Sequence, residues 1–323
     1  MKNETLSRII EVIKENKLSL APFLIFFVLI GVGEVISKGF ASIGHLRFLL
    51  MTTVPYGVMG IGQTFVILSG REDLDFSIGA MGSLAIVLGA QFFEIYSFSV
   101  GLILILLIGI AFGILNGVGV RIFGVPPLVM TFGTAAVMVG TGIAYTKGNP
   151  AGNAAPLLRE LAIGRIGGFP IIIIIWILLS ILAIFILHKT TYGRCLYASG
   201  SNPEASRIAG ISTNKIGIIA YALSGLFAAF AGLLMLGRVQ TPAQFHPAES
   251  LTLPVIAGVV LGGTNFFGGE GGYLGTIGGV LALVTLARFL PRLGVPSAGR
   301  ILFNGVILII ILLFYARRGT LRK

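Results

Sequence analysis

Four charged residues, Arg71, Glu72, Asp73 and Asp75, stand together between two long apolar runs of the sequence. Carboxylates in such a place can bind a proton or a cation, because ionisable groups near a membrane face protein or water and seek partners. The same residues could instead form a short loop in which Arg71 pairs with a neighbouring acid. We favour the loop, because the acids lie at the edge of an apolar run, and we find no support for catalytic carboxylates here.

A second polar stretch, residues 188–215, contains the signals of a short helix. Asn202 precedes Pro203 and Glu204, and this order predicts a helix start: Asn accepts hydrogen bonds from first-turn amides, Pro fits the first position, and an acid suits the positive end of the helix dipole. The helix would place small apolar residues on one face and a basic residue on another before a glycine ends it: Ala205, Ile208 and Ala209, then Arg207, then Gly210. Such a helix could dock into a groove of a partner, or lie on the membrane as an amphipathic linker, and spacing alone leaves both open.

A third feature is a glycine-rich stretch near the C-terminal end. Gly271, Gly275 and Gly279 follow one another at four-residue spacing, which allows helices to approach closely. No Lys-Ser or Lys-Thr follows these glycines, so a phosphate-binding loop is predicted neither here nor elsewhere in the sequence. We therefore predict a packing element and expect any ATP to be bound by another polypeptide. The glycines assigned to this element are Gly262, Gly263, Gly268, Gly269, Gly271 and Gly275.

Four polar residues lie inside apolar runs, at Gln63, Asn116, Thr131 and Asn304. They could line a pathway for a hydroxylated solute. Equally, they could hydrogen-bond neighbouring helices to one another, and for each residue taken alone we favour this second interpretation.

Histidine and cysteine are sparse. His45, His188 and His246 are far apart in the sequence, and Cys195 is the only cysteine. A single cysteine excludes a disulfide framework and a cysteine-based metal cluster within the chain. We therefore predict no metal site, no Ser-His-Asp triad and no cofactor.

The composition shows where these features must reside. Of the 323 residues, 55% are hydrophobic and only 11% are charged, with a mean hydropathy of +0.98. A soluble protein is about 25% charged, so the composition predicts an integral membrane protein. The net charge of +11 then indicates basic residues flanking the membrane and near its lipid, not a nucleic-acid-binding protein.

We expect an all-α, polytopic fold with about ten transmembrane helices, each about 20 residues long. Pro55 and Pro254 interrupt two of them, which favours a packed bundle in which neighbouring helices satisfy the freed backbone groups. The expected spans are 20–36, 48–68, 76–95, 99–123, 126–145, 170–187, 216–236, 251–263, 273–290 and 301–315.

The basic residues predict the orientation of the bundle. An even number of spans puts both termini on one side, and Lys and Arg number 14 in the tails and loops of that side against 9 on the other, which together make the 23 of the sequence. Both termini are therefore expected in the cytoplasm. This divides the chain into a tail (1–19), one transmembrane domain (20–315) with a cytoplasmic loop (188–215), and a second tail (316–323).

Four sequence segments follow one another in collinear order between residues 48 and 290. They are GQTFVILSGREDLDFSIGAMGSLAIVLGA, NGVGVRIFGVPPLVMTFGTAAVMVGTGIAY, NPEASRIAGISTNKIGIIAYALSGLFAAFAGLL and LPVIAGVVLGGTNFFGGEGGYLGTIGGVL. Together they resemble the permease subunits of ribose- and xylose-type ATP-binding-cassette importers, in the binding-protein-dependent transport permease family. The first resembles that family's Gly-Ile-Asp-Leu-Ser segment, with Asp73 and Leu74 as the Asp-Leu pair; here Arg71 and Glu72 replace Gly-Ile, and Asp75 stands where Ser is usual.

The resemblance implies a ten-helix translocation subunit of the inner membrane and its partners. These would be ATP-binding subunits, a second permease subunit in a homodimer or heterodimer, and an extracytoplasmic solute-binding protein. The family's usual cargo is a monosaccharide or similar polyhydroxy solute. The third segment implies docking on an ATPase subunit for Asn202, Glu204, Ala205, Arg207, Ala209 and Gly210.

Two other classes of function compete with this hypothesis of alternating access driven by ATP. An ion-coupled secondary transporter would use Asp73, Asp75 or Glu270 as its charge carrier, although such carriers place these groups near the membrane midplane. A membrane-embedded hydrolase would need a nucleophile and a base, and the sequence contains no motif for them.

Overall fold

Helices make up most of the described part of the chain, as the apolar runs predict. The structure is a computed structural model that describes residues 17–70, 72–241 and 248–296, with the single residues 299, 302, 305 and 306. The longer helices are α2 (Lys17–Ile36), α3 (Ile43–Ser69), α4 (Ile78–Ile95), α5 (Phe98–Arg121), α6 (Pro127–Thr146), α8 (Ile171–Lys189), α11 (Thr213–Val239) and α13 (Tyr273–Phe289). The shorter elements are α7 (Pro156–Ile163), α9 (Thr191–Ser201), α10 (Pro203–Ile208), α12 (Thr252–Leu261), the 3-10 helices η1 (Glu249–Leu251) and η2 (Leu290–Leu293), and the strands β1 (Arg165–Ile166) and β2 (Phe169–Pro170). The all-α prediction is confirmed apart from this one small hairpin.

The hairpin of β1 and β2 is absent from our sequence predictions. Its strands pair antiparallel, with Arg165 opposite Pro170, and are too short to show an alternating pattern. The turn consists of Gly167 and Gly168, whose φ angles are 57° and 81°. Two consecutive positive φ angles are what a tight hairpin turn requires, and glycine adopts them without strain.

The expected spans match the observed helices closely over the described residues. Seven helices there are long and apolar enough to cross a membrane, and two shorter apolar helices, Leu20–Ile36 and Glu249–Leu261, occupy the expected first and eighth spans. Continuous helix 252–261 has 10 residues and reaches only about 15 Å, so it cannot cross the bilayer alone. The expected span 301–315 apart from residues 302, 305 and 306, most of the tail 1–19, and the tail 316–323 lie outside the described residues, so the count of ten stays a prediction.

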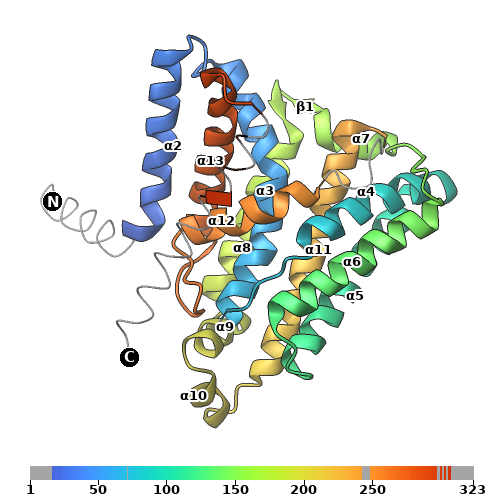
Figure 1. Ribbon diagram of the computed structural model, residues 1–323, viewed down its shortest axis with the longest axis vertical. Helices are drawn as coiled ribbons and strands as arrows, with labels where there is room; N and C mark the ends of the chain where they lie inside the picture. Colours follow the sequence, from blue (N-terminus) through green and yellow to red (C-terminus); the bar gives the residue numbers. More distant parts are fainter. Residues whose placement is uncertain are drawn as a thin grey trace, which may run out of the picture.

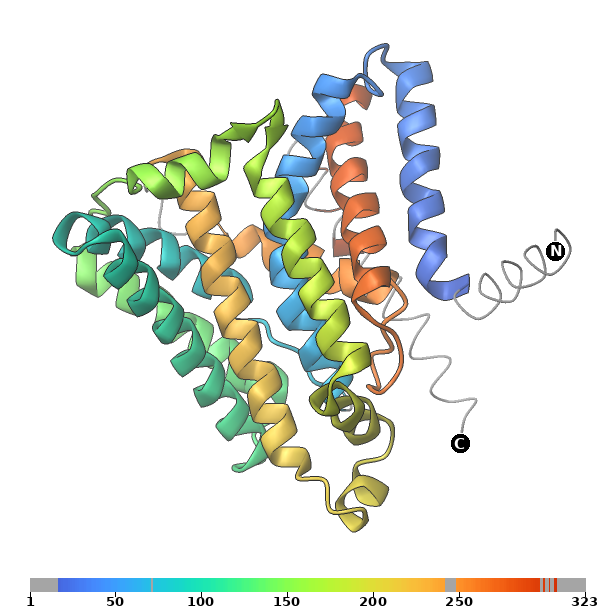
Figure 2. The same cartoon turned by 180° about the vertical axis from the view of Figure 1, so that it is seen from behind.

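The core forms around α11. This helix packs against α3, α4, α5 and α7 and runs through the middle of the bundle (Figure 2). By contrast, α5 and α8 expose bulky aliphatic side chains such as Ile103, Leu107, Leu178 and Ile181. In a membrane protein such faces suit lipid, so the described fold is that of a multi-pass membrane protein.

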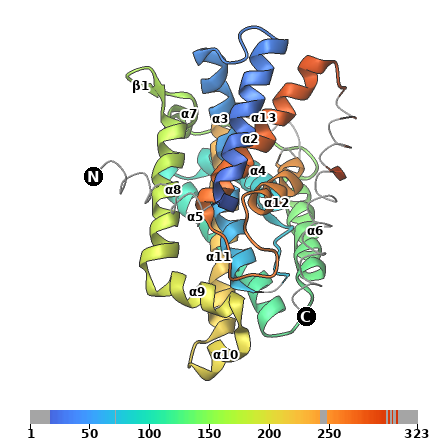
Figure 3. The same ribbon diagram turned by 90° about the vertical axis from the view of Figure 1, so that its left-hand side faces the viewer.

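Two ends of the molecule carry different short elements. Helices α9 and α10 lie at one end, and α7 with the β hairpin lies at the other (Figure 1); the side view keeps α10 at the extremity (Figure 3). The end of α3, the end of α5 and the glycine-rich connection after α12 reach the same end as α9, because they contact one another there. Consecutive spans that cross the membrane in opposite directions, as the sequence predicts, would place the ends of α3 and α5, helix α9 and the connection after α12 on the same side of the membrane.

Candidate functional site

The short helix predicted after Asn202 is confirmed as α10. The Asn202 side-chain oxygen accepts a hydrogen bond from the Ala205 amide at 3.0 Å, while the Asn202 amide donates to the Ala198 carbonyl of α9 at 3.0 Å. Asn202 is therefore both the C-cap of α9 and the N-cap of α10. Gly210, with φ of +81°, ends the turn as its position predicts.

The outer surface of α10 is open to a partner. Ile208 is 87% exposed, and Ala205 and Ala209 are exposed as well. Glu204 and Arg207 form an exposed ion pair at 3.6 Å, which contributes little to stability because solvent screens it. The residues that the resemblance assigns to docking thus lie together at the extremity of the molecule.

Helix α9 connects α10 to the bundle and was not predicted as a separate helix. The Thr190 hydroxyl caps its start by accepting from the Gly193 amide at 3.2 Å. Near its end, buried Ser199 donates from its hydroxyl to the Ser69 carbonyl at 3.2 Å. A Cβ added at Gly200 would overlap the Leu68 carbonyl, so α9 packs directly on the last turn of α3.

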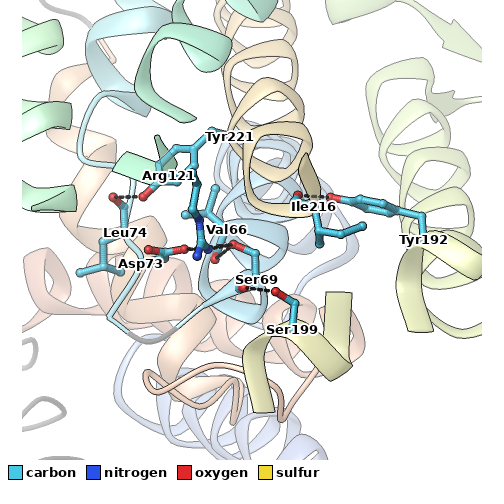
Figure 4. A network of polar contacts seen from close by, with 9 residues as sticks. All are labelled: Val66, Ser69, Asp73, Leu74, Arg121, Tyr192, Ser199, Ile216 and Tyr221. Carbon is cyan, nitrogen blue, oxygen red and sulfur yellow. Dashed lines mark hydrogen bonds and ion pairs between the residues drawn. The ribbon is translucent and has the colours of Figure 1, made fainter. Parts of the chain in front are cut away.

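An ion pair between Arg121 and Asp73 lies beside this contact (Figure 4). The two side chains are 15% and 4% exposed, so the pair is largely shielded from water. Arg121 also donates to the Ser69 hydroxyl at 2.9 Å, and that hydroxyl lies 3.1 Å from Asp73. Arg71, the pairing partner we had considered for an acid of this segment, lies outside the described residues.

The position of Arg121 has two physical reasons. It is the last residue of α5, where the negative end of the helix dipole favours a cation. Its guanidinium passes between Gly70 and Gly217, because a Cβ at either glycine would overlap it. Glycines from two distant elements therefore leave the space that the side chain occupies.

Asp75 is also buried, but its partners are different. One carboxylate oxygen accepts from the Ser77 amide at 2.9 Å and the Ser77 hydroxyl at 2.5 Å, and the other accepts from the Ser224 hydroxyl at 2.7 Å. Within the described part of the chain no Lys or Arg forms an ion pair with Asp75. Burial raises the pKa of Asp75, while the hydrogen bonds from Ser77 and Ser224 oppose this.

Three of the four polar residues considered for a pathway gather around this segment. Asn116 donates to the Ser77 hydroxyl at 2.9 Å and accepts from Thr134 at 2.6 Å. Thr131 accepts from the Phe76 amide at 3.1 Å, and the Gln63 amide, suitably oriented, bonds the backbone of Asp75. All three are buried within one subunit, as residues that join helices are; a role in a pathway stays a prediction. Asn304 lies outside the described residues.

The glycine-rich stretch packs one backbone against another. A Cβ at Gly275 of α13 would overlap the Gly262 carbonyl that follows α12, so no side chain fits between the two backbones at this point. The connection between them then reaches the end of α3, where the Gly269 amide donates to the Leu68 carbonyl at 3.2 Å. The Tyr197 hydroxyl of α9 donates to the Gly271 carbonyl at 2.9 Å.

These contacts meet at what we call the α3 junction. It brings together the last turn of α3, the segment that follows it, the end of α5 and α9, and we define it by Leu68, Ser69, Gly70, Asp73, Arg121 and Ser199. Sequence reasoning selected only Asp73 of these residues. Arg121 at the end of an apolar run was the one available signal, since a cation there needs an anion.

Comparison with known proteins identifies similar chains. The profile of a family described as branched-chain amino acid transport system / permease component matches residues 46–313. The chain is 34% identical to the ribose import permease protein RbsC of Bacillus subtilis over 307 residues, which cover 93% of this chain and 94% of that protein. It is also 34% identical to RbsC of Escherichia coli K12 over 294 residues (88% and 90%), and 31% identical to the fructose import permease protein FrcC of Rhizobium meliloti over 296 residues (87% and 80%). No solved structure matches the chain.

Proposed function

The chain belongs to the family of branched-chain amino acid transport system / permease components, and from this premise we propose that it is the permease subunit of an ATP-binding-cassette importer. Its solute is a monosaccharide or related small polyhydroxy compound that enters the cytoplasm. Similarity to ribose and fructose import permeases over most of each chain carries this proposal. An ion-coupled carrier is not favoured, because the relatives that match are subunits of importers.

The end of the molecule that holds α9 and α10 is proposed to face the cytoplasm, together with both termini. There α10 would dock on a separate ATP-binding subunit through Glu204, Arg207 and the exposed apolar residue Ile208. The exposed position of this helix supports the proposal. A helix that offers a small apolar face and charged neighbours suits a groove of a partner protein.

The opposite end would then receive the extracytoplasmic solute-binding protein. A hollow of 460 Å³ lies there between α7 and the end of α11. Arg159, Glu160, Asn153 and Gln240 supply polar groups to its wall, as a surface that contacts another protein in water needs. A second permease subunit, identical or different, would complete the pathway in the membrane.

The segment after α3 fits the family pattern in a second register. Asp75, Phe76 and Ser77 repeat the Asp-Leu-Ser order with Phe in place of Leu, two residues after the register with Asp73 and Leu74. We propose the second register, because Asp75 accepts from both the amide and the hydroxyl of Ser77. This geometry gives the Asp-x-Ser spacing a physical role at the start of α4.

Reconstitution tests the proposed function. The chain is placed in proteoliposomes with its ATP-binding subunits and solute-binding protein, and uptake of labelled ribose and fructose is measured. We expect uptake only when every component and ATP are present. Uptake by this chain alone would contradict the proposal.

The docking role of α10 is tested by the double variant Glu204→Ala and Arg207→Ala. We expect an intact fold and a loss of sugar uptake per ATP hydrolysed, because the complex can no longer transmit closure of the ATPases. The control is Arg47→Ala, which removes an exposed charge that lies neither on α10 nor in the wall of the hollow. Unchanged coupling in the Glu204/Arg207 variant would refute the docking assignment.

A further inference from the structure

Helices α9 and α10 are built to move together. The Asn202 amide donates to the Ala198 carbonyl at the end of α9, and the Asn202 side-chain oxygen accepts from the Ala205 amide at the start of α10. No flexible residue separates the two helices, since one residue caps both. A force on α10 therefore reaches α9 without an intervening loop.

The inner end of α9 is attached to α3 by buried contacts. Ser199 is 1% exposed and bonds the Ser69 carbonyl, while Gly200 lies against the Leu68 carbonyl. Direct backbone packing of this kind transmits a displacement, because there is no side chain to rearrange between the helices.

Arg121 joins this contact to the segment 70–77. The same guanidinium nitrogen donates to Ser69 in α3 and pairs with Asp73 in the segment. Two residues later Asp75 and Ser77 lead into the first turn of α4, and Ser77 holds Asn116 of α5. Within the described residues, the contacts of the α3 junction thus connect α10 to the polar interior of the bundle.

The hydrogen-bonding capacity of the Arg121 guanidinium is only partly satisfied in this arrangement. Its Nε group is buried and has no hydrogen-bond partner within the described structure. An arginine offers five N–H donors in a rigid fork, and a buried donor left unpaired costs free energy. An arrangement in which the fork pairs more fully would remove this cost.

We propose that Arg121 is a positioning residue that transmits movement of α9 and α10 to the segment 70–77. The inference rests on the proposed function, because it presumes that ATP-binding subunits move α10. The transmission runs from Ser199 to Ser69, from Ser69 to Arg121, and from Arg121 to Asp73. Coupling measurements on variants of these residues test this route.

The first test measures the coupling ratio, defined as sugar molecules imported per ATP hydrolysed by the complete complex in proteoliposomes. Arg121→Lys keeps the charge but loses the planar fork, so we expect ATP hydrolysis to persist and the coupling ratio to fall about fivefold or more, the size of a typical coupling between sites. Asp73→Asn with Arg121→Gln leaves no unpaired charge and is expected to show the same loss. The matched control is Arg238→Lys, since Arg238 also lies in the last turn of its helix and is half-buried but donates to Met51 outside the junction.

A second test follows the movement itself. In a Cys195→Ser background, a fluorophore is placed at Arg194→Cys on α9 or at Glu72→Cys in the segment 70–77, both exposed positions outside the proposed docking residues. In the otherwise unaltered complex we expect both signals to change on addition of ATP. In Arg121→Lys we expect the signal at position 194 to persist and the signal at position 72 to be lost.

These outcomes separate transmission from a structural role. A coupling ratio equal to that of the unaltered complex, or a response at position 72 that survives in Arg121→Lys, overturns the inference. Failure of the unaltered complex to import sugar with ATP would instead overturn the proposed function. If the Arg121 variants do not fold, Ser199→Ala removes one hydrogen bond of the same route, and an unchanged signal at position 72 in that variant also overturns the inference.

Discussion

Asp73 and Asp75 are two buried carboxylates in one short segment, and they are stabilised in different ways. Asp73 pairs with Arg121, a cation that comes from a helix 48 residues away in sequence. Asp75 instead accepts hydrogen bonds from Ser77 and Ser224 and lies at the start of α4, where the positive end of the helix dipole favours an anion.

Because their partners differ, Asp73 and Asp75 have different structural roles, although both belong to the segment 70–77. Removing one partner of a buried ion pair strongly destabilises the folded protein, because the other charge is left without compensation. That sensitivity suits Asp73, which connects elements that meet at the α3 junction. A carboxylate held by hydroxyls and an amide tolerates more change, which suits Asp75 as an organiser of the bundle interior.

The largest effect is expected for Arg121→Ala. This variant leaves Asp73 buried without a cation, and we expect the free energy of unfolding to fall by about 3–5 kcal/mol. Equilibrium unfolding in mixed detergent micelles measures it. The control is Arg121→Ala with Asp73→Ala, which should be more stable than the single variant; a double variant whose loss equals the sum of both single losses would show that the two residues do not interact.

A smaller effect is expected for Asp75→Ala. Removal of the carboxylate leaves the donors of Ser77 and Ser224 unpaired, and we expect the free energy of unfolding to fall by about 2 kcal/mol. Asp75→Asn keeps an acceptor of the same shape and should cost less. If Asn were as costly as Ala in the same unfolding experiment, the charge of Asp75 would matter more than its hydrogen bonds, and the contrast with Asp73 would disappear.

Gly217→Ala tests the contrast between Asp73 and Asp75 by disturbing Arg121, the partner of Asp73. The added methyl group overlaps the Arg121 side chain, so the variant should lose about 1–2 kcal/mol of stability without disturbing Asp75. Gly133→Ala is the matched control in another helix, because a Cβ there meets no heavy atom within 4 Å. Equal stabilities of the two alanine variants would contradict the proposed path of Arg121.

The smallest effect is a pH dependence that belongs to Asp75. Burial raises its pKa in the folded protein above the unfolded value of about 3.9. The proton on Asp75 therefore contributes stability that is fully present below the unfolded pKa and is lost as pH rises through the folded pKa. The Tm of the protein should fall more steeply with rising pH than that of Asp75→Asn; parallel slopes would contradict the raised pKa.

Much of the fold was predictable because hydropathy determines which segments can cross a membrane. The predicted spans from 48–68 to 273–290 agree with helices within a few residues, and Asn202 and Gly210 bound α10 as their chemistry predicts. The junction was not predictable in the same way. Arg121 and Asp73 are 48 residues apart in sequence, and nothing in local sequence identifies which acid a distant arginine will face.

The glycines show the same limit. Four-residue spacing predicted close packing near Gly275, and a backbone contact with Gly262 is present. Gly70 and Gly217 are not part of such a pattern, and their role depends on where the Arg121 side chain runs. A glycine that makes room for a distant side chain has no local sequence signal.

We propose that this permease imports a sugar at the expense of ATP hydrolysed by other subunits. The most direct measurement is uptake of labelled ribose and fructose into proteoliposomes that hold the complete complex, once with ATP on the side of α10 and no ion gradient, and once with a proton or sodium gradient and no ATP. We expect uptake of at least one of these sugars in the first condition and none in the second. Uptake driven by the gradient without ATP would contradict it.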